Sequence, residues 1–375
     1  MASAVSPSAV SSAIRWAQRT DALASACGDA VAAVAGGARP LPRDTTRARV
    51  ACEPAAMRTS PLRHVIGALV VAPWVAWAVV RWLELDDGFP LVAAISYTPY
   101  AAALSLVGAL LALALRARVV ALVGLVAAVA LIAAVAPRGV EGAGLASDEA
   151  RGMPFVAMTL NLFDGKAEAR EILRLVRKYR VDVLSVQELT PRALRGLDAA
   201  GARRLLPGRV LRPGPRAEGA GLLARTRLRA LRTRSVGGRP LPQARLRVRG
   251  RSVLVASVHP IPPLTDGDTR VWRRQLRTLP GPERAGVPRV LLGDFNATLD
   301  HRELRRLLAR GYRDAADATG DGLRPTWPVG RARPPITIDH VLLPRQILIR
   351  RLTLREIPGS DHRALIVDLL ITDAP

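Results

Sequence analysis

Three long apolar runs follow one another in the N-terminal part of the chain, and they constrain its fold more than any other feature. Residues 65–80, 89–115 and 119–137 contain no Asp, Glu, Lys or Arg. A helix that crosses a bilayer needs about 20 apolar residues, which the second and third runs supply, whereas the first is shorter and contains Pro73. Helices of a soluble core would keep a polar face, and three such runs leave none. The sequence therefore predicts three transmembrane helices within residues 57–138.

Charged residues between the runs predict the orientation of these helices. Arg58 and Arg63 precede the first run, and Arg116 and Arg118 separate the second from the third, whereas the segment between the first two is acidic. Because Lys and Arg concentrate in cytoplasmic loops, three crossings place everything after about residue 138 outside the cytoplasm of a multi-pass cell-membrane protein. A cleaved signal peptide would not explain three runs. The aromatic residues that are candidates for anchors at the membrane interface are Trp74, Trp77, Trp82, Tyr97 and Tyr100.

Residues 1–56 are rich in Ala, Ser, Arg and Pro and show no sustained apolar period, which predicts a disordered tail. An alternative is that this segment is not translated, because Met57 is followed by arginines and an apolar run, as at the start of a membrane protein. The two cysteines, Cys27 and Cys52, both lie in this tail. A disulfide framework and a cysteine zinc site are therefore excluded for the rest of the chain.

Residues 139–152 are polar and Gly-rich, which predicts a linker. The sequence pattern changes after it, in residues 153–375. Short apolar runs there alternate with occasional amphipathic segments, and this order is typical of a layered α/β or α+β domain. The predicted strands are 154–160, 181–186, 220–224, 244–248, 252–258, 289–292, 336–342, 347–354 and 364–370, and the predicted helices are 167–179, 269–279 and 302–308.

The positive charge of the chain is concentrated in its C-terminal part. The net charge is +24, and residues 151–375 hold 43 basic and 21 acidic residues, a net charge of +22. A basic domain suits an anionic partner such as nucleic acid or lipid phosphate. The competing explanation is the codon bias of a GC-rich genome, because the chain has many arginines and only two lysines, Lys166 and Lys178.

Polar side chains of types that bind metal ions or transfer protons lie beside the predicted strands. Carboxylate and amide oxygens are hard ligands that suit Mg²⁺ or Mn²⁺, and the scarcity of Cys and clustered His disfavours zinc. Each such residue alone has a simpler explanation as turn chemistry. Sites are nevertheless often built at the ends of strands on a rigid sheet, and three of the five histidines lie there. The positions are Asn161, Glu188, His259, Asp294, Asn296, Asp339, His340, Asp361 and His362.

These positions lie in six short motifs whose order and spacing resemble the endonuclease/exonuclease/phosphatase superfamily, which includes deoxyribonuclease-like nucleases, inositol polyphosphate phosphatases and neutral sphingomyelinases. The motifs are Thr159-Leu160-Asn161-Leu162, Gln187-Glu188, Ser257-Val258-His259-Pro260, Gly293-Asp294-Phe295-Asn296, Ile338-Asp339-His340 and Ser360-Asp361-His362. The resemblance covers about residues 153–372. It implies a four-layer α/β sandwich, two packed sheets flanked by helices, C-terminal to the three transmembrane helices.

Two departures from the family pattern stand out. Ala224 occupies a position where the family more usually has Ser, and Pro260-Ile261-Pro262-Pro263 follows His259 where Leu is commoner. The second departure alters the loop beside the expected site, so analogies of substrate are weakened there.

The resemblance also implies roles for the polar residues. Glu188, helped by Asn161, corresponds to the main Mg²⁺ ligand, and Asp361 to a further metal contact. Asp294 corresponds to the residue that orients or deprotonates the attacking water. Asn296 corresponds to a residue that contacts the phosphate or the water. His362 corresponds to the histidine that contacts the scissile phosphate, and Asp339 to its carboxylate partner. His259 corresponds to a phosphate ligand or to the proton donor for the leaving oxygen. His340 is expected to face away from the site.

Together, the apolar runs and the motifs predict a membrane-anchored, Mg²⁺-dependent phosphoesterase that hydrolyses phosphodiesters of nucleic acid. Its catalytic domain is expected outside the cytoplasm. The alternative substrate class is a lipid headgroup, because the membrane tether brings the site close to lipids and the domain has few aromatic residues for stacking bases. A catalytically dead binding protein is disfavoured by the complete set of motif residues. A transporter is disfavoured because the apolar runs carry no acidic or basic residue. No protein partner can be inferred.

Overall fold

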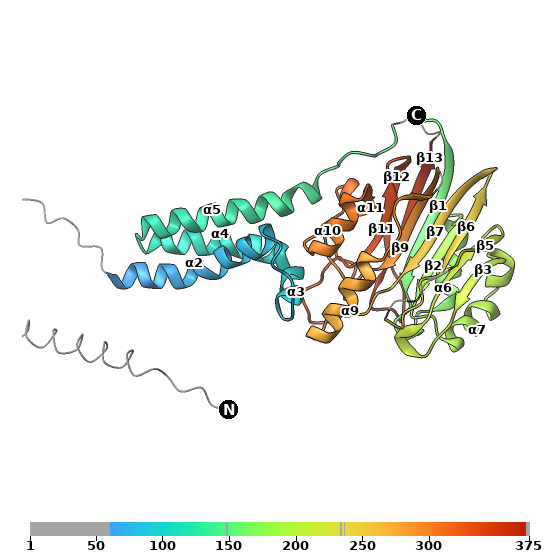
Figure 1. Cartoon of the computed structure of the whole chain (residues 1–375), viewed down its shortest axis with the longest axis horizontal. Coiled ribbons are helices and arrows are strands. Elements are labelled where there is room, and N and C mark those ends of the chain that lie inside the picture. Colours follow the sequence, from blue (N-terminus) through green and yellow to red (C-terminus); the bar gives the residue numbers. More distant parts are fainter. Residues whose placement is uncertain (1–60, 148, 233–234, 236, 285, 373–375) are drawn as a thin grey trace, which may run out of the picture. The chain divides into compact units, whose positions relative to one another are not determined.

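The computed structural model describes residues 61–372 apart from 148, 233–234, 236 and 285 (Figure 1). The predicted tail, residues 1–56, lies outside the described residues, and so do both cysteines.

Three helices near the start of the described chain are long and apolar enough to cross a membrane, as the sequence predicted. The first is α2 (Pro61–Trp82); the second segment, Leu91–Ala114, joins α3 (Leu91–Ala94), η1 (Ile95–Tyr97) and α4 (Thr98–Ala114); the third joins α5 (Arg118–Val135) and η2 (Ala136–Gly139). Small residues line their contacts, as is usual for helices that pack closely in a membrane. A Cβ atom on Gly108 would meet the indole of Trp74 at 2.7 Å, and one on Gly124 would meet Val71 at 2.9 Å.

The rest of the described chain forms two mixed β-sheets. The six-stranded sheet has the order β12-β13-β1-β2-β4-β3, and the other has the order β10-β11-β9-β7-β6-β5 with β8 paired to β9. The strands are β1 (Met153–Asn161), β2 (Val183–Gln187), β3 (Gly208–Arg212), β4 (Ala220–Ala224), β5 (Leu228–Ala230), β6 (Gln243–Val248), β7 (Arg251–Val258), β8 (Glu283–Arg284), β9 (Val287–Asp294), β10 (Tyr312–Asp314), β11 (Asp339–Pro344), β12 (Ile347–Glu356) and β13 (Arg363–Ile371).

Three apolar clusters hold this part of the chain in four layers. One cluster lies between the two sheets and includes Phe155 and Leu292. The second packs the first sheet against α6 (Ala169–Lys178) and α7 (Pro191–Ala199). The third packs the second sheet against α9 (Asp266–Arg277) and α10 (Arg302–Ala309), around the fully buried Trp272. The expected sandwich of two sheets flanked by helices is confirmed.

The sequence missed several elements, most of which are too short to show a period. These are β3, β5, β8, β10, α7, α8 (Ala202–Leu205), η3 (Arg216–Glu218) and α11 (Ala315–Ala318). The helix α7 did carry a signal, since the Thr190 hydroxyl accepts a hydrogen bond from the Ala193 amide and Pro191 follows it. The predicted strand 336–342 was placed too early: β11 begins at Asp339, so Asp339 and His340 start a strand and do not follow one.

Strand direction explains why distant motifs meet at one edge. The strands β1 and β2 run parallel, as do β7 and β9, so their carboxyl ends point the same way. The strand β11 is antiparallel to β9 and pairs Asp339 with Asp294, and β13 is antiparallel to β1. The starts of β11 and β13 therefore lie beside the ends of β1 and β9.

A buried ion cluster joins the apolar helices to the sheet domain. The Asp300 carboxylate, fully buried before α10, lies 2.7 Å from Arg81 Nε of α2 and 2.6 Å from an Arg138 guanidinium nitrogen of η2. Nearby, the Arg302 amide donates to Asp86 Oδ2 at 3.0 Å, and His301 Nε2 lies 2.8 Å from the Val92 carbonyl oxygen. We call this set of contacts the junction.

Removing the negative charge of Asp300 should destabilise the junction strongly. Asp300→Asn would leave two buried arginines without a counterion, a change that typically costs about 3–5 kcal/mol. Thermal unfolding of the purified protein in detergent should show a clearly lower Tm. Glu171→Gln is the matched control, because it breaks an exposed pair with Arg174 and should change the stability by less than about 0.5 kcal/mol. Equal Tm values for the two variants would contradict the importance of the cluster.

Candidate active site

Asn161, the last residue of β1, connects the two sheets through its side chain. Its Nδ2 donates to Glu188 Oε1 at 3.1 Å and to Asp294 Oδ2 at 3.0 Å, and its Oδ1 accepts from the Phe163 amide. The backbone oxygen of Asn161 accepts from the Ser360 hydroxyl at 2.7 Å, which ties the loop before β13 to the same place. One amide thus sets the spacing of two carboxylates that come from different sheets.

Glu188 follows β2 and adopts a left-handed backbone conformation with φ +56°. Its second oxygen accepts from the backbone amide of Asp164. Gln187, fully buried just before it, donates to the Ser185 and Thr159 hydroxyls and holds the strand end in register. The carboxylate is therefore oriented by the backbone and by Asn161 and reaches the pocket described below.

Asp294 ends β9 and is buried among other titratable groups. Its Oδ1 accepts from the Asn296 amide at 2.8 Å. Burial, followed by the negative charge of Asp339, raises the pKa of Asp294 to about 7. The residue before it must be glycine, because a Cβ on Gly293 would lie 1.9 Å from the Val258 carbonyl oxygen of β7. A single small residue therefore allows β7 and β9 to bring His259 and Asp294 together.

His362 and Asp339 form a buried ion pair, with His362 Nδ1 2.9 Å from Asp339 Oδ2. Burial opposes the charged imidazolium, but the charge and hydrogen bond of Asp339 outweigh it and raise the pKa of His362 to about 9. The other ring nitrogen, Nε2, lies 3.9 Å from Asp294 Oδ2 and 3.9 Å from Asp361 Oδ1. This histidine is therefore a cation at neutral pH that points its free nitrogen among carboxylates.

His259 is in the opposite protonation state. Burial, then the positive charges of Arg239 and His362, hold its pKa well below the usual value. Its Nε2 lies 3.7 Å from Asp294 Oδ2, and its Nδ1 lies 3.4 Å from the Arg239 guanidinium. The site thus combines a neutral imidazole and a charged imidazolium on two sides of one carboxyl group.

Asp361 faces the same region from the loop before β13. Its Oδ2 accepts from Trp327 Nε1 at 3.1 Å and lies 3.2 Å from an Arg331 guanidinium nitrogen. Neither Trp327 nor Arg331 was predicted from the sequence, and both stand outside the six motifs. Their only sequence signal is position: they precede the Asp339 motif in a segment rich in Pro and Arg.

Two carboxylate oxygens in this region, Asp339 Oδ1 and Asp361 Oδ1, are buried and have no hydrogen-bond partner among the described residues. Unpaired buried anionic oxygens are costly, and a cation relieves that cost. Ligand atoms of Asp294, Asp339 and His362 lie within 4.8 Å of one another, which is a spacing that can hold a metal ion. The carboxylate oxygens of this group therefore fit a hard divalent cation.

His340 is placed away from this centre. Its Nδ1 lies 2.9 Å from Asp314 Oδ2 and its Nε2 lies 2.8 Å from the Ala297 carbonyl oxygen, and its ring packs edge-on against Phe295. Burial opposes the charged ring, but Asp314 outweighs it and raises the pKa of His340. The expectation that His340 faces away from the site agrees with these contacts.

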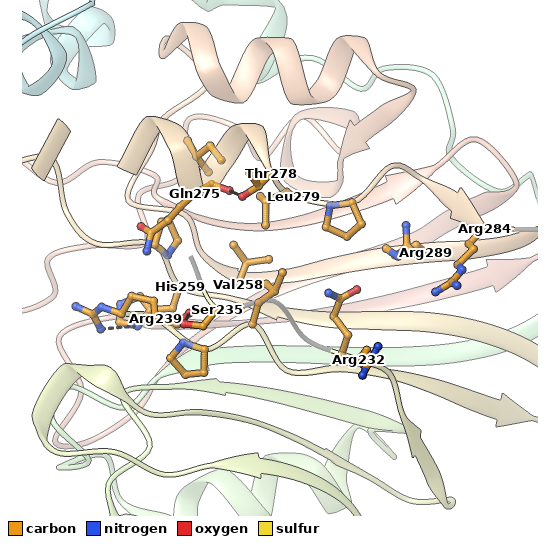
Figure 2. A pocket seen from close by; sticks show the side chains of 16 residues that line it. Arg232, Ser235, Arg239, Val258, His259, Gln275, Thr278, Leu279, Arg284 and Arg289 are labelled. Atoms are coloured by element: carbon orange, nitrogen blue, oxygen red, sulfur yellow. Dashed lines mark hydrogen bonds between the residues drawn. The ribbon is translucent and has the colours of Figure 1, made fainter. Parts of the chain in front are cut away.

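Two cavities adjoin the motif residues. One, of about 470 Å³, is lined by Glu188, His259, Asp294, Asn296, Asp361 and His362, together with Trp327, Arg331, Arg333 and residues of the second apolar segment. The other, of about 660 Å³, shares His259 and Arg239 with the first and is also lined by Arg232, Arg284 and Arg289. Figure 2 shows Arg239 and His259 at one end of this second cavity and Arg284 and Arg289 at the other. Both cavities therefore carry positive charge that suits an anionic ligand.

Several solved structures are similar to this chain. Humanized D. rerio TDP2 is 16% identical and matches 58% of this chain and 98% of its own, with a TM-score of 0.46. An endonuclease/exonuclease/phosphatase from Beutenbergia cavernae is 18% identical over 60% of this chain and 73% of its own, with a TM-score of 0.46. Sphingomyelinase C from Streptomyces griseocarneus is 18% identical over 58% of this chain and 99% of its own, with a TM-score of 0.41. No curated protein matches the sequence at a significant level.

The family comparison covers the motifs described above. The sequence profile of the Endonuclease/Exonuclease/phosphatase family matches residues 158–362, which are more than half of the chain. The protein therefore belongs to the Endonuclease/Exonuclease/phosphatase family.

Proposed function

We propose that this protein is a membrane-anchored, Mg²⁺-dependent hydrolase of phosphodiester bonds. Members of its family hydrolyse phosphoesters and generally depend on a divalent metal. The observation that carries the proposal is the buried cluster of Asp294, Asp339 and His362 beside a basic pocket, with unpaired carboxylate oxygens at Asp339 within the cluster and at the neighbouring Asp361. Such a cluster suits an anionic phosphoryl group and a cation together.

The side chains have different roles in hydrolysis. A water oxygen forms a bond to phosphorus while the bond from phosphorus to the leaving oxygen breaks. Asp294, with a pKa near 7, orients that water and takes its proton. His362, charged and held by Asp339, stabilises the phosphoryl oxygens, while the neutral His259 donates its N–H to the phosphate or the leaving oxygen. Asn296 lines the pocket and helps to fix the phosphate or the water.

Glu188 and Asp361 line the same pocket, and Asn161 donates a hydrogen bond to Glu188. We assign Mg²⁺, with Mn²⁺ as a substitute, to Glu188, Asn161 and Asp361. When bound there, the ion would add positive charge beside the phosphoryl oxygens. The unpaired Asp361 Oδ1 supports this assignment.

The substrate class has two candidates. The net charge of +22 on residues 151–375 and the second basic cavity favour a nucleic acid. A lipid headgroup is the second candidate, because residues of an apolar helical segment line the catalytic pocket.

Chelation of the metal should abolish activity. EDTA should stop hydrolysis of bis(p-nitrophenyl) phosphate by the purified protein, and Mg²⁺ or Mn²⁺ should restore it, because the ligands are hard oxygen atoms. Glu188→Gln removes one ligand charge and should raise the Mg²⁺ concentration needed for half-maximal rate. Full activity in EDTA would refute the metal assignment.

Substitutions of the polar cluster should lower kcat without unfolding the domain. Asp294→Asn and His362→Ala should each reduce kcat by about 10²–10⁴, because general acid–base and preorganised electrostatic contributions have that size. Asp339→Asn should cost less than His362→Ala, since it only loosens the imidazole. The double variant Asp294→Asn/His362→Ala should lose less than the product of the single losses, because the residues act as a unit.

Asp321→Asn is the matched control for these variants. Asp321 forms a partly exposed ion pair with Arg324 and does not line the pocket. We expect it to leave kcat unchanged. Wild-type turnover in Asp294→Asn, with an unchanged circular dichroism spectrum, would contradict the proposed role of that carboxyl group.

The orientation in the membrane follows from the arginine pattern. A phosphatase reporter fused after residue 375 should be active, since alkaline phosphatase works only outside the cytoplasm, whereas the same reporter inserted between Arg116 and Arg118 should be inactive. A cytoplasmic fluorescent reporter should show the opposite pattern. The reverse result in both assays would place the catalytic domain in the cytoplasm.

A further inference from the structure

The catalytic pocket has one wall that does not come from the sheet domain. Ala93, Ser96 and Tyr97 line it together with Asp294 and His362. These three residues belong to α3 and η1, in the first two turns of the second apolar segment, Leu91–Ala114. A segment apolar enough to cross a membrane is therefore in contact with the space where the phosphoryl group would be cleaved.

Specific contacts hold this wall in place. Val92 is fully buried and belongs to the apolar cluster around Trp272. Its carbonyl oxygen lies 2.8 Å from His301 Nε2, and the Phe89 amide donates to Asp266 Oδ1 at 2.9 Å. The Tyr100 hydroxyl donates to the Pro335 carbonyl oxygen at 2.8 Å, next to the pocket residue Ile336. These contacts therefore attach the wall formed by Ala93, Ser96 and Tyr97 to the sheet domain on both sides of the pocket.

The length of the segment places the wall near the boundary between the hydrocarbon and the lipid headgroups. Leu91–Ala114 has 24 residues, and a helix of that length is about 36 Å long, roughly 6 Å more than the hydrocarbon core of a bilayer. At 1.5 Å per residue this excess corresponds to about four residues, so Ser96 and Tyr97, the sixth and seventh residues of the segment, lie near the boundary between the hydrocarbon and the headgroups when the excess is on the domain side. Tyrosine is enriched at this interface, where phosphates of lipids also lie.

Exposed apolar side chains gather around the same region. Among the described residues of the sheet domain, the large apolar side chains that are strongly exposed are Leu264, 64% exposed, and Leu323, 42% exposed. Leu264 lines the pocket, two residues before the Asp266 that binds Phe89. A Cβ atom on Gly139, at the end of the third apolar segment, would lie 3.7 Å from Leu323. Both leucines therefore lie beside the ends of the apolar segments, where lipid would cover them.

Two arginines, in addition to Arg239, give the pocket the positive charge that a lipid phosphate requires. Arg331 and Arg333 line it, and Arg331 has half of its side chain exposed while it contacts Asp361. Arg333 lies over the Trp327 ring at 5.5 Å from its centroid. Basic side chains at a membrane surface attract anionic lipid headgroups.

We propose that the substrate is a phosphodiester lipid that enters the pocket from the bilayer along the second apolar segment, with its chains remaining in the membrane. The proposal rests on the proposed phosphodiesterase function and specifies its substrate. Water adds to phosphorus, the bond to one ester oxygen breaks, and the proton lost by water ends on that oxygen. We prefer this candidate to a nucleic acid, despite the basic charge of the domain, because Ala93, Ser96 and Tyr97 of the apolar segment line one side of the pocket.

The test uses the full-length protein in proteoliposomes of phosphatidylethanolamine, phosphatidylglycerol, cardiolipin, phosphatidylinositol and sphingomyelin with Mg²⁺. Mass spectrometry measures cleaved lipid, and parallel assays measure bis(p-nitrophenyl) phosphate and single-stranded DNA. We expect cleavage of at least one of these lipids at a higher rate than cleavage of the DNA. Leu264→Glu should lower the ratio of lipid rate to soluble-diester rate by about tenfold, because it removes an apolar contact of one leucine at the pocket rim.

Leu323→Glu is the matched control, because it places the same charge beside an apolar segment but outside the pocket. We expect that ratio to stay at the wild-type value. An equal fall of this ratio in both variants would overturn the role given to Leu264 at the rim of the pocket. Cleavage of the soluble diester and DNA without cleavage of any lipid would overturn the lipid proposal while the phosphodiesterase function stands. Absence of cleavage of every substrate would refute the phosphodiesterase function itself.

Discussion

The repulsion among buried carboxylates at one edge of two sheets is the constraint on which the site depends. Asp294, Asp339 and Asp361 converge there, and their charges are balanced in part by the imidazolium of His362 and, at Asp361, by Arg331. Burial, followed by the charge of Asp339, raises the pKa of Asp294 to about 7, and two acceptor oxygens have no partner among the described residues. An arrangement with unpaired carboxylate oxygens suits a cation, and its charges set the acid–base character of the neighbouring groups.

A second set of buried charges connects this site to the apolar helices. Asp300 binds Arg81 and Arg138, and the next residue, His301, contacts the backbone of the second apolar segment through Val92. Because the same segment continues into the pocket wall at Ser96 and Tyr97, the junction also fixes part of the catalytic pocket. Anchoring and substrate access therefore depend on one group of contacts, and His301 has a structural role that its sequence position did not indicate.

The segment after His259, where the sequence departs from the family pattern, also contributes to the pocket. Pro262 and Pro263, with Leu264, line the pocket at its apolar side. The loop thus turns an exposed leucine towards the rim near the membrane segment, whereas the motif residues on either side, His259 and Asp294, keep their positions at the strand ends.

The sequence by itself determined the three apolar helices and a layered domain of strands and helices, and its motifs, through their resemblance to the family, indicated the sandwich of two sheets and the residues at its edge. Apolar periods fix which segments are buried, and the motif residues stand beside strands whose directions bring them together. Only the tertiary structure decided the protonation of His259 and His362, the part played by Trp327 and Arg331, and the contact of Tyr97 with the catalytic pocket. These depend on distances between segments far apart in the chain, and a pKa or a pocket wall is set by such neighbours, which no local pattern records.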